Sequence, residues 1–343
     1  MIRSVQLTFC GSSRLAPGGW WLVRRFGAWG AAVLLGMAAT SQLAAHDSPE
    51  HVVELLTARM ETAGPRPELL WRRAAEYRAL AKLPEAEKDL LAAVRRKKDF
   101  LPALQDLSRV QLARGNSRGA ARTVLRALAL RLTPQAKGEL LMLQAEILAE
   151  RGRLKEAVDA CDRALTFAET ANPEWYLARF QFQYRLGWFE AAALGLRRGV
   201  ERTGNAVLEA EWIDASLDAG QFDEVAGPIG TGIAESRCQA SWLIRRGRVQ
   251  EGFGKISEAQ SDYLAALAEL NARLGGRGKD FTLLVERGLV YALLGDIPLA
   301  RLDLNRAREL GADDWALNRL ERLAGASEDP KPSASATEKR AAR

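Results

Sequence analysis

Pairs of small residues seven positions apart recur through most of the chain and limit the folds it can adopt. The first member of each pair is Ala86, Ala120, Ala157, Ala192, Ala259 or Ala300, with Val225 once in its place. The successive steps are 34, 37, 35, 33, 34 and 41 residues. The second members are Ala93, Ala127, Ala164, Gly199, Ala266 and Ala307. Because seven residues make two turns along one helix face, the pattern predicts repeated helices that approach their neighbours closely.

A glycine five residues before most of these alanines predicts a tight turn between two helices. These glycines are Gly115, Gly152, Gly187, Gly220, Gly254 and Gly295. The clearest copy is the stretch 281–307, where Gly288 and Tyr291 share one face of a first helix. Gly295 and Asp296 then stop that helix and start the next. The repeating unit is therefore predicted to be a helix, a turn and a second helix.

A helix-turn-helix period of about 34 residues with small residues at these positions resembles the tetratricopeptide repeat family. The resemblance implies an all-α, right-handed superhelical α-solenoid of about seven repeats. We place the repeats at residues 67–100, 101–134, 138–171, 173–205, 206–239, 240–273 and 281–314. The family provides binding scaffolds in many unrelated pathways, so the resemblance implies a binding role but no particular partner.

Three repeats depart from the pattern. The step of 37 inserts residues around Leu132–Pro134, and the step of 41 contains the glycine-rich stretch 275–278, which we expect to be a flexible joint. In the fifth repeat the second helix would contain Gly227 and Pro228. Proline inside a helix costs about 3 kcal/mol, so we expect that helix to be kinked, shortened or shifted in register.

The repeats are flanked by segments of other kinds. Residues 46–66 are predicted to form a leader helix, because Ser48, Pro49 and Glu50 suit the start of a helix. Residues 315–325 are predicted to form a helix that covers the last apolar face of the solenoid. Residues 326–343 are rich in Pro, Ser and Ala without apolar periodicity, which predicts a disordered tail.

The N-terminus has the pattern of a secretory signal peptide. Arg24 and Arg25 precede an apolar stretch, 26–45, that ends in small residues. We therefore expect residues 1–45 to be removed near Ala45 and the protein to be exported, to the periplasm or the outside. The alternative is an uncleaved anchor in the inner membrane, which would make the chain a membrane-tethered envelope assembly factor.

Charge and composition narrow the class of partner. The chain has 343 residues and a formal charge of +6, but residues 1–45 contain four arginines and no acid. The high isoelectric point thus owes much to the leader, and no focused basic surface for nucleic acid is indicated. We expect a protein or peptide partner, no contact with nucleic acid and a monomer or weak oligomer.

Residues suited to catalysis or metal binding are scarce. The only histidines, His46 and His51, precede the repeats, which argues against a catalytic histidine or a multi-histidine metal site within them. We predict no catalytic residues, no cofactor and no metal. The alternative is a metal-binding or metal-delivery role for His46 as a processed N-terminus. The resemblance places Cys161 at a position that the family fills with a large apolar residue, so we expect it to be buried. Cys161 and Cys238 lie in repeats that are not neighbours, so we expect no bridge between them.

In the family the first helix of each repeat lines the concave side of the solenoid. The positions expected to face that side are basic at the N-terminal end, acidic in the middle and apolar in the last repeat, where they include Leu289 and Leu293. Such a mixed surface suits an extended peptide or a partner helix. Trp71 and Tyr184 are the expected aromatic anchors. The predicted partner-binding residues are Trp71, Arg78, Arg109, Glu146, Glu150, Gln181, Tyr184, Arg185, Asp214 and Arg248.

Overall fold

The described part of the chain is entirely helical. The computed structural model describes residues 48–167, 172–276 and 280–325, and these contain helices α1 to α16 and no strand. The predicted signal peptide, His46 and the predicted disordered tail lie outside these residues. The helices are α1 (Pro49–Ala63), α2 (Pro67–Ala79), α3 (Leu83–Arg96), α4 (Leu101–Ala113), α5 (Ser117–Leu128), α6 (Pro134–Glu150), α7 (Leu154–Phe167), α8 (Pro173–Arg185), α9 (Phe189–Thr203), α10 (Ala206–Asp218), α11 (Phe222–Glu235), α12 (Ala240–Gly252), α13 (Ile256–Gly276), α14 (Phe281–Leu293), α15 (Ile297–Glu309) and α16 (Asp314–Gly325).

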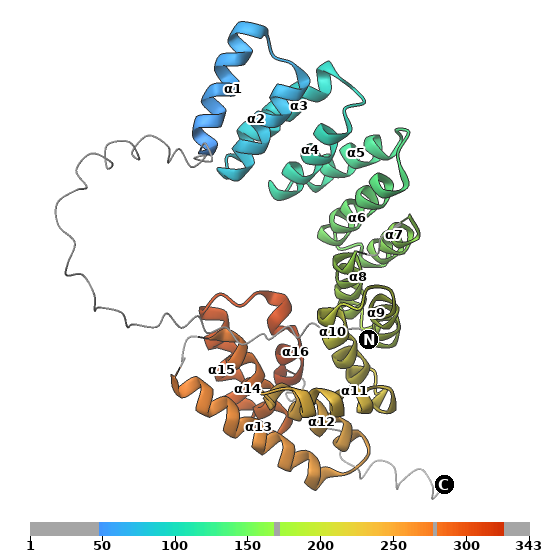
Figure 1. Ribbon diagram of the computed structural model, residues 1–343, viewed down its shortest axis with the longest axis vertical. Coiled ribbons are helices and arrows are strands. Elements are labelled where there is room, and N and C mark those ends of the chain that lie inside the picture. The colour runs from blue at the N-terminus through green and yellow to red at the C-terminus, as the bar shows by residue number, and fades with distance from the viewer. Residues whose placement is uncertain (1–47, 168–171, 277–279, 326–343) are drawn as a thin grey trace, which may run out of the picture.

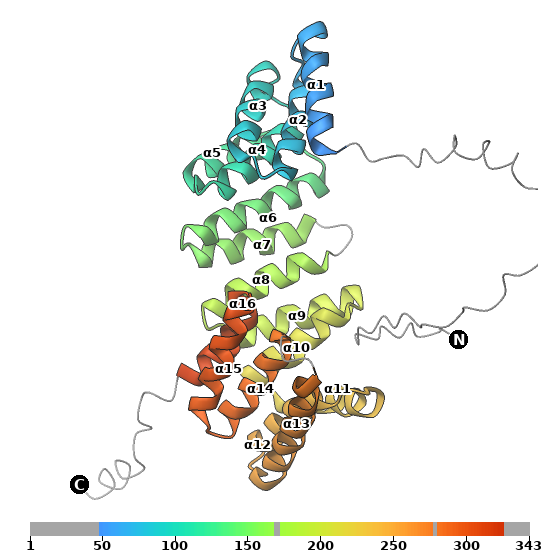
Figure 2. The same cartoon turned by 90° about the vertical axis from the view of Figure 1, so that its left-hand side faces the viewer.

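Consecutive helix pairs stack into a curved solenoid, which confirms the predicted fold class. Figure 1 shows α4, α6, α8 and α10 along the inner side of the curve, with α5, α7, α9 and α11 outside them. We call the first helix of each pair, from α2 to α14, an inner helix and its partner an outer helix. Figure 2 shows that the array turns so far that its last helix, α16, returns to the level of α8 to α10.

The small residues that set the period hold the outer helices against the inner ones. Ala86, Ala120, Ala157, Ala192 and Ala300 are fully buried, and Ala259 is 2% exposed. Glycine serves the same purpose on inner helices. A methyl group on Gly247 would lie 2.4 Å from the ring of Tyr263 in the partner helix α13. The predicted pattern of small residues therefore marks the sites of closest helix approach.

The turns within the pairs use left-handed backbone, as the glycines predicted. Gly115 has a φ of 75° and Gly295 a φ of 86°. In the first pair this place is taken by Ala81, the only described residue other than glycine with a positive φ, 56°. A side chain disfavours that conformation, so the turn of the first pair is strained relative to the others.

Three local expectations need correction. Helix α6 begins at Pro134 because Thr133 caps it, its side chain accepting from the amide of Ala136, so the extra residues lengthen the helix. Helix α13 continues to Gly276, so Gly275 and Gly276 are helical, and the rest of the predicted joint lies outside the described part. Helix α11 runs for 14 residues with Pro228 inside it, so it is not shortened.

Helix α11 also keeps its register. Val225, which replaces the recurrent small residue, is fully buried, and Ile229 one turn later is 1% exposed. Those two are the only fully buried positions of α11, whereas five residues of α9 are buried. The fifth pair is thus complete in length but poorly anchored.

The two ends are covered by single helices. At the start, the Ser48 side chain accepts from the amide of His51 to cap α1, and Leu56 and Met60 pack into the first core cluster. At the end, Leu317 and Leu320 of α16 are fully buried against the core of α14 and α15. Among the described helices, none has the length and apolarity needed to cross a membrane.

Candidate partner-binding site

At the N-terminal end of the inner side, three predicted site residues meet on one carboxylate. Trp71 Nε1 of α2 donates to Asp106 Oδ2 of α4 at 2.7 Å. Arg78 donates to Asp106 Oδ1 at 2.7 Å, and Arg109 reaches the same oxygen at 3.4 Å. The ring of Trp71 packs edge-to-face on Phe100, with centroids 5.9 Å apart. The hub, Asp106, was not among the predicted residues.

Trp71 is therefore oriented by its neighbours while the arginines remain accessible. The side chains of Arg78 and Arg109 are 37% and 47% exposed. Trp71 is half-buried, so one part of the indole packs and another faces solvent. A fixed indole beside two accessible guanidinium groups is a preorganised anchor, and such groups lose little entropy when a partner binds.

Further along the inner side, the predicted residues of α6 and α8 are accessible. Glu146 and Glu150 of α6 and Arg185 of α8 are exposed, and Gln181 is half-buried. With Trp71, Arg78 and Arg109 they form what we call the open stretch. It runs over α2, α4, α6 and the C-terminal half of α8. Its charge changes from basic near α2 and α4 to acidic on α6.

The remaining three predicted residues, Tyr184, Asp214 and Arg248, are less accessible than expected, because Tyr184 is buried and the other two are half-buried. Tyr184 is 5% exposed because α16 lies over it. Trp315 of α16 packs edge-to-face on Tyr184 and on Phe180, with centroid distances of 5.6 Å and 5.0 Å. The hydroxyl of Tyr184 donates to Asp218 Oδ2 at 2.9 Å. Burial raises the pKa of Tyr184 to about 12, so the phenol stays protonated and can donate.

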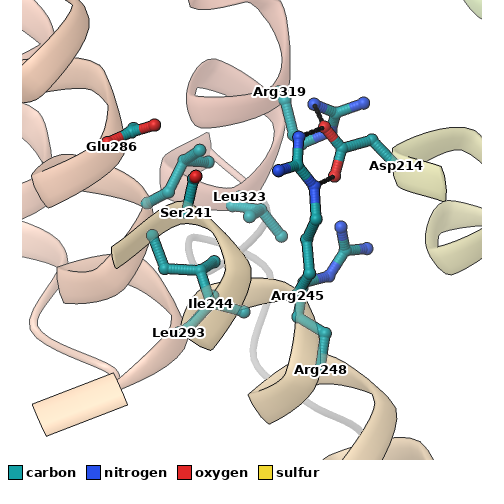
Figure 3. Close-up of a pocket in the computed structure, with 10 residues that line it drawn as sticks. Asp214, Ser241, Ile244, Arg245, Arg248, Glu286, Leu293, Arg319 and Leu323 are labelled. Carbon is teal, nitrogen blue, oxygen red and sulfur yellow. Dashed lines mark hydrogen bonds and ion pairs between the residues drawn. The ribbon is translucent and has the colours of Figure 1, made fainter. Parts of the chain in front are cut away.

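Asp214 and Asp218 of α10 hold a cluster of four arginines. Arg245 makes a bidentate pair with Asp214, both distances being 2.9 Å, and Arg248 contacts Asp218 at 2.6 Å. Arg319 of α16 reaches both aspartates, at 3.3 Å and 3.2 Å, and Arg322 reaches Asp218 at 2.9 Å. Bidentate, charge-assisted contacts of this kind are geometrically demanding. Figure 3 shows Asp214 between Arg245 and Arg319.

The arginines decide the charge state of both aspartates. Burial alone would raise the pKa of Asp218, but the positive charges of Arg319, Arg248 and Arg322 outweigh it and lower the pKa. The same balance, with Arg245 and Arg319, holds the pKa of Asp214 below its ordinary value. Both carboxylates are thus ionised at neutral pH, and the ion-pair cluster is stable there.

A small cavity lies beside this cluster, between α10, α12, α14 and α16. Its volume is about 150 Å³, and it is lined by Asp214, Ser241, Ile244, Arg245, Arg248, Glu286, Leu289, Leu293, Arg319 and Leu323. Leu289 and Leu293, the predicted apolar end of the inner side, therefore line this cavity together with Arg319 and Leu323 of α16. Figure 3 shows Leu293 and Leu323 at the cavity. Burial raises the pKa of Glu286, although the positive charge of Arg245 acts to lower it.

A second set of arginine–aspartate pairs joins the two helices within individual repeats. Arg73 pairs with Asp89, Arg246 with Asp262 and Arg287 with Asp303, each by two hydrogen bonds of 2.5 to 2.8 Å. Each aspartate is buried and lies 16 residues after its arginine. This 16-residue spacing recurs in repeats one, six and seven, so the sequence contains a signal for these pairs that the pattern of apolar and small residues does not include.

Cysteine and metal-ligand side chains add no site in the described residues. Cys161 is buried in the core of α6 and α7, as expected, and burial raises the pKa of its thiol to about 12. In the ranges that the structure describes there is no group of three His, Cys, Asp or Glu side chains arranged to hold a metal ion.

Known structures share this architecture. A tetratricopeptide repeat protein from Parabacteroides merdae superposes with a TM-score of 0.51 at 19% identity, covering 75% of this chain and 98% of that one. The C-terminal part of a TPR repeat-containing protein from Cytophaga hutchinsonii gives 0.52 at 15% identity, covering 72% of this chain and 98% of that one. No family model and no curated protein sequence matches the chain. The class is thus a helical-repeat solenoid, and the particular fold is that of the tetratricopeptide repeat.

Proposed function

We propose that this protein is a non-catalytic scaffold that binds a segment of another protein along the open stretch. The observation that carries the proposal is the anchor on Asp106, where Trp71 is held in place beside two accessible arginines. Residues that contribute most binding energy in protein interfaces are enriched in Trp, Tyr and Arg. The fold supports this role because stacked repeats present one continuous inner surface.

The charges of the open stretch indicate the kind of segment that fits. A partner segment would place acidic residues against Arg78 and Arg109 and basic residues against Glu146 and Glu150. Opposite charges in this order would fix the direction of the bound segment and accelerate association. Binding should therefore weaken as salt is added.

We also propose that the protein works outside the cytoplasm, in the periplasm or beyond the cell. The support is the basic, apolar and small-residue pattern of residues 1–45. The mass of the mature protein distinguishes cleavage near Ala45 from a retained membrane anchor.

Affinity capture from cell-envelope fractions tests the binding role. The bait is the mature chain, compared with Arg78→Ala/Arg109→Ala and with Arg122→Ala/Arg163→Ala. The control removes the same charge from exposed positions on outer helices α5 and α7. We expect partners retained by the wild type and the control to be lost with the first variant, while its circular dichroism stays unchanged. Equal capture by all three chains would contradict the proposed surface.

A further inference from the structure

Helix α16 has two faces that meet different parts of the solenoid. One face carries Leu317 and Leu320, which are buried against α14 and α15. A methyl group on Gly288 of α14 would lie 2.6 Å from Leu320, so the two helices are in very close contact. The other face carries Trp315, Arg319 and Arg322. These residues contact α8, α9 and α10, which lie about 100 to 135 residues earlier in the chain.

The surface under that second face is matched to it. It consists of Phe180, Tyr184, Phe189, Asp214 and Asp218, which we call the covered surface. Its aromatic part receives Trp315, and the guanidinium of Arg322 lies 5.2 Å and 4.7 Å from the ring centroids of Tyr184 and Phe189. Its acidic part receives Arg319 and Arg322. One guanidinium can lie over an aromatic ring and pair with a carboxylate at the same time, and this combination suits arginine better than lysine.

Simple capping of the solenoid does not need this match. The apolar face of α16 already covers the end of α14 and α15. Trp315, Arg319 and Arg322 add contacts to the distant fourth and fifth repeats. The arginines follow Trp315 by four and seven residues. Residues four and three apart share one helix face, so they form a single recognition surface.

The weak fifth pair provides a place where this contact can open. Helix α11 lies, in chain order, between the covered surface and the helices that carry α16. It contains Gly227, Gly230 and Gly232 as well as Pro228. A methyl group on Gly227 or Gly230 would meet no atom within 4 Å, so packing does not explain those glycines. Each costs about 1 kcal/mol of helix stability relative to alanine, and proline costs more. Segments of low local stability are those that open first. Opening there also has to release the pairs of Arg245 with Asp214 and of Arg248 with Asp218, which join α12 to α10.

From this geometry we propose that the covered surface is a docking site for a partner helix. That helix carries an aromatic residue and two arginines that follow it by four and by seven residues. In the closed chain α16 occupies the site as an intramolecular competitor, and the partner displaces it while the solenoid opens at α11. The site is separate from the open stretch, so it goes beyond the scaffold function proposed above.

When a tethered competitor occupies the site, only open chains can bind an added helix. The apparent Kd for that helix is the intrinsic Kd divided by the fraction of chains that are open. Weakening α16 in the full chain should therefore increase binding of a helix supplied from outside. The probe is a fluorescent peptide of sequence DDWALNRLERLAG, residues 313–325, with alanine at the positions of Leu317 and Leu320. Those replacements keep the aromatic and arginine stripe and remove the two leucines that α14 and α15 bury.

Fluorescence anisotropy would compare the wild-type chain with Arg319→Ala/Arg322→Ala and with Arg122→Ala/Arg163→Ala. The control removes two exposed arginines of α5 and α7, helices that are not part of the covered surface or of α11. We expect the first variant to bind the peptide about tenfold or more tightly than the wild type and the control. A peptide with glutamine at both arginine positions should lose that binding, and this comparison needs no further change to the protein.

Two results would overturn the proposal. One is equal affinity of all three chains for the peptide, or equal affinity for the peptide with glutamine. The other is a dimer of Arg319→Ala/Arg322→Ala in sedimentation that the peptide does not dissociate. Peptide binding that is unchanged by Arg78→Ala/Arg109→Ala would show that this site and the open stretch are independent.

Discussion

Arg319 Nε donates to Asp218 Oδ2 at 3.2 Å, joining two helices that are 101 residues apart in the chain. In an open solenoid such distant helices would not meet, because each repeat contacts only its neighbours. The contact therefore divides the inner side into an accessible part, from α2 to the exposed face of α8, and a part covered by α16 that includes Phe180 and Tyr184 of α8. Tyr184, Asp214 and Arg248 belong to the covered part, which explains why they differ from the other predicted site residues.

The contact of α16 with α14 depends on the absence of a side chain at Gly288. Gly288→Ala would place a methyl group 2.6 Å from Leu320, so α16 has to shift away from α14. Overpacking of this kind costs about 1–3 kcal/mol. We expect a lower thermal midpoint and faster amide exchange in α16. The control, Gly230→Ala, adds a methyl group in open space within α11 and should raise the midpoint. A midpoint unchanged by Gly288→Ala would contradict the close approach.

The ion-pair cluster predicts how stability depends on pH. The pKa of Asp218 in the folded chain is lower than its ordinary value of 3.8, so the ionised form stabilises the fold. This contribution is complete above about pH 4 and is lost as the pH falls below it. We expect Asp218→Asn to cost about 3 kcal/mol at pH 7, because it leaves buried guanidinium groups unpaired. Denaturant titrations between pH 7 and pH 2 should give a flatter profile for the variant. Parallel profiles would contradict the assignment.

The pairs within repeats make a separate prediction. Asp303 is 2% exposed and holds Arg287 by two hydrogen bonds of 2.7 Å. Asp303→Asn leaves that arginine partly unpaired, and we expect a loss of about 3 kcal/mol in the free energy of unfolding. The double variant Arg287→Met/Asp303→Leu should recover most of it, because neither charge then remains buried. Chemical denaturation measures both. A double variant as unstable as the single one would show that the attraction between the two charges exceeds the free-energy cost of removing them from water.

The first turn offers a stabilising change. Ala81 has a φ of 56°, where glycine stands in the corresponding turns of the later pairs. Ala81→Gly should stabilise the chain by about 0.5–1 kcal/mol, since relief of the strain exceeds the greater flexibility of the unfolded chain. Gly115→Ala makes the reverse change in the second pair and should destabilise it. Thermal unfolding of the two variants should therefore shift in opposite directions.

The sequence predicted the solenoid and its period because both depend on local patterns. Ala86 and Ala300 are buried where the spacing placed them, and the turn residues have the backbone that glycine favours. The repeat pattern also predicted that Tyr184 lies on the inner side, as the structure shows, but it did not predict that α16 covers this residue. The position of α16 depends on curvature that accumulates over many helix pairs. A local sequence pattern does not predict this total curvature. Asp106 was missed because a single carboxylate leaves no periodic signal.

The most direct test of this account is the distance between α16 and the fourth repeat in solution. Spin labels at exposed Glu190 of α9 and at Asp314 of α16, in a full chain without native cysteines, report that distance by pulsed electron resonance. We predict one narrow, short distribution for the wild type and a broad, longer one for Arg319→Ala/Arg322→Ala. A broad distribution already in the wild type would contradict the closure of the inner side by α16.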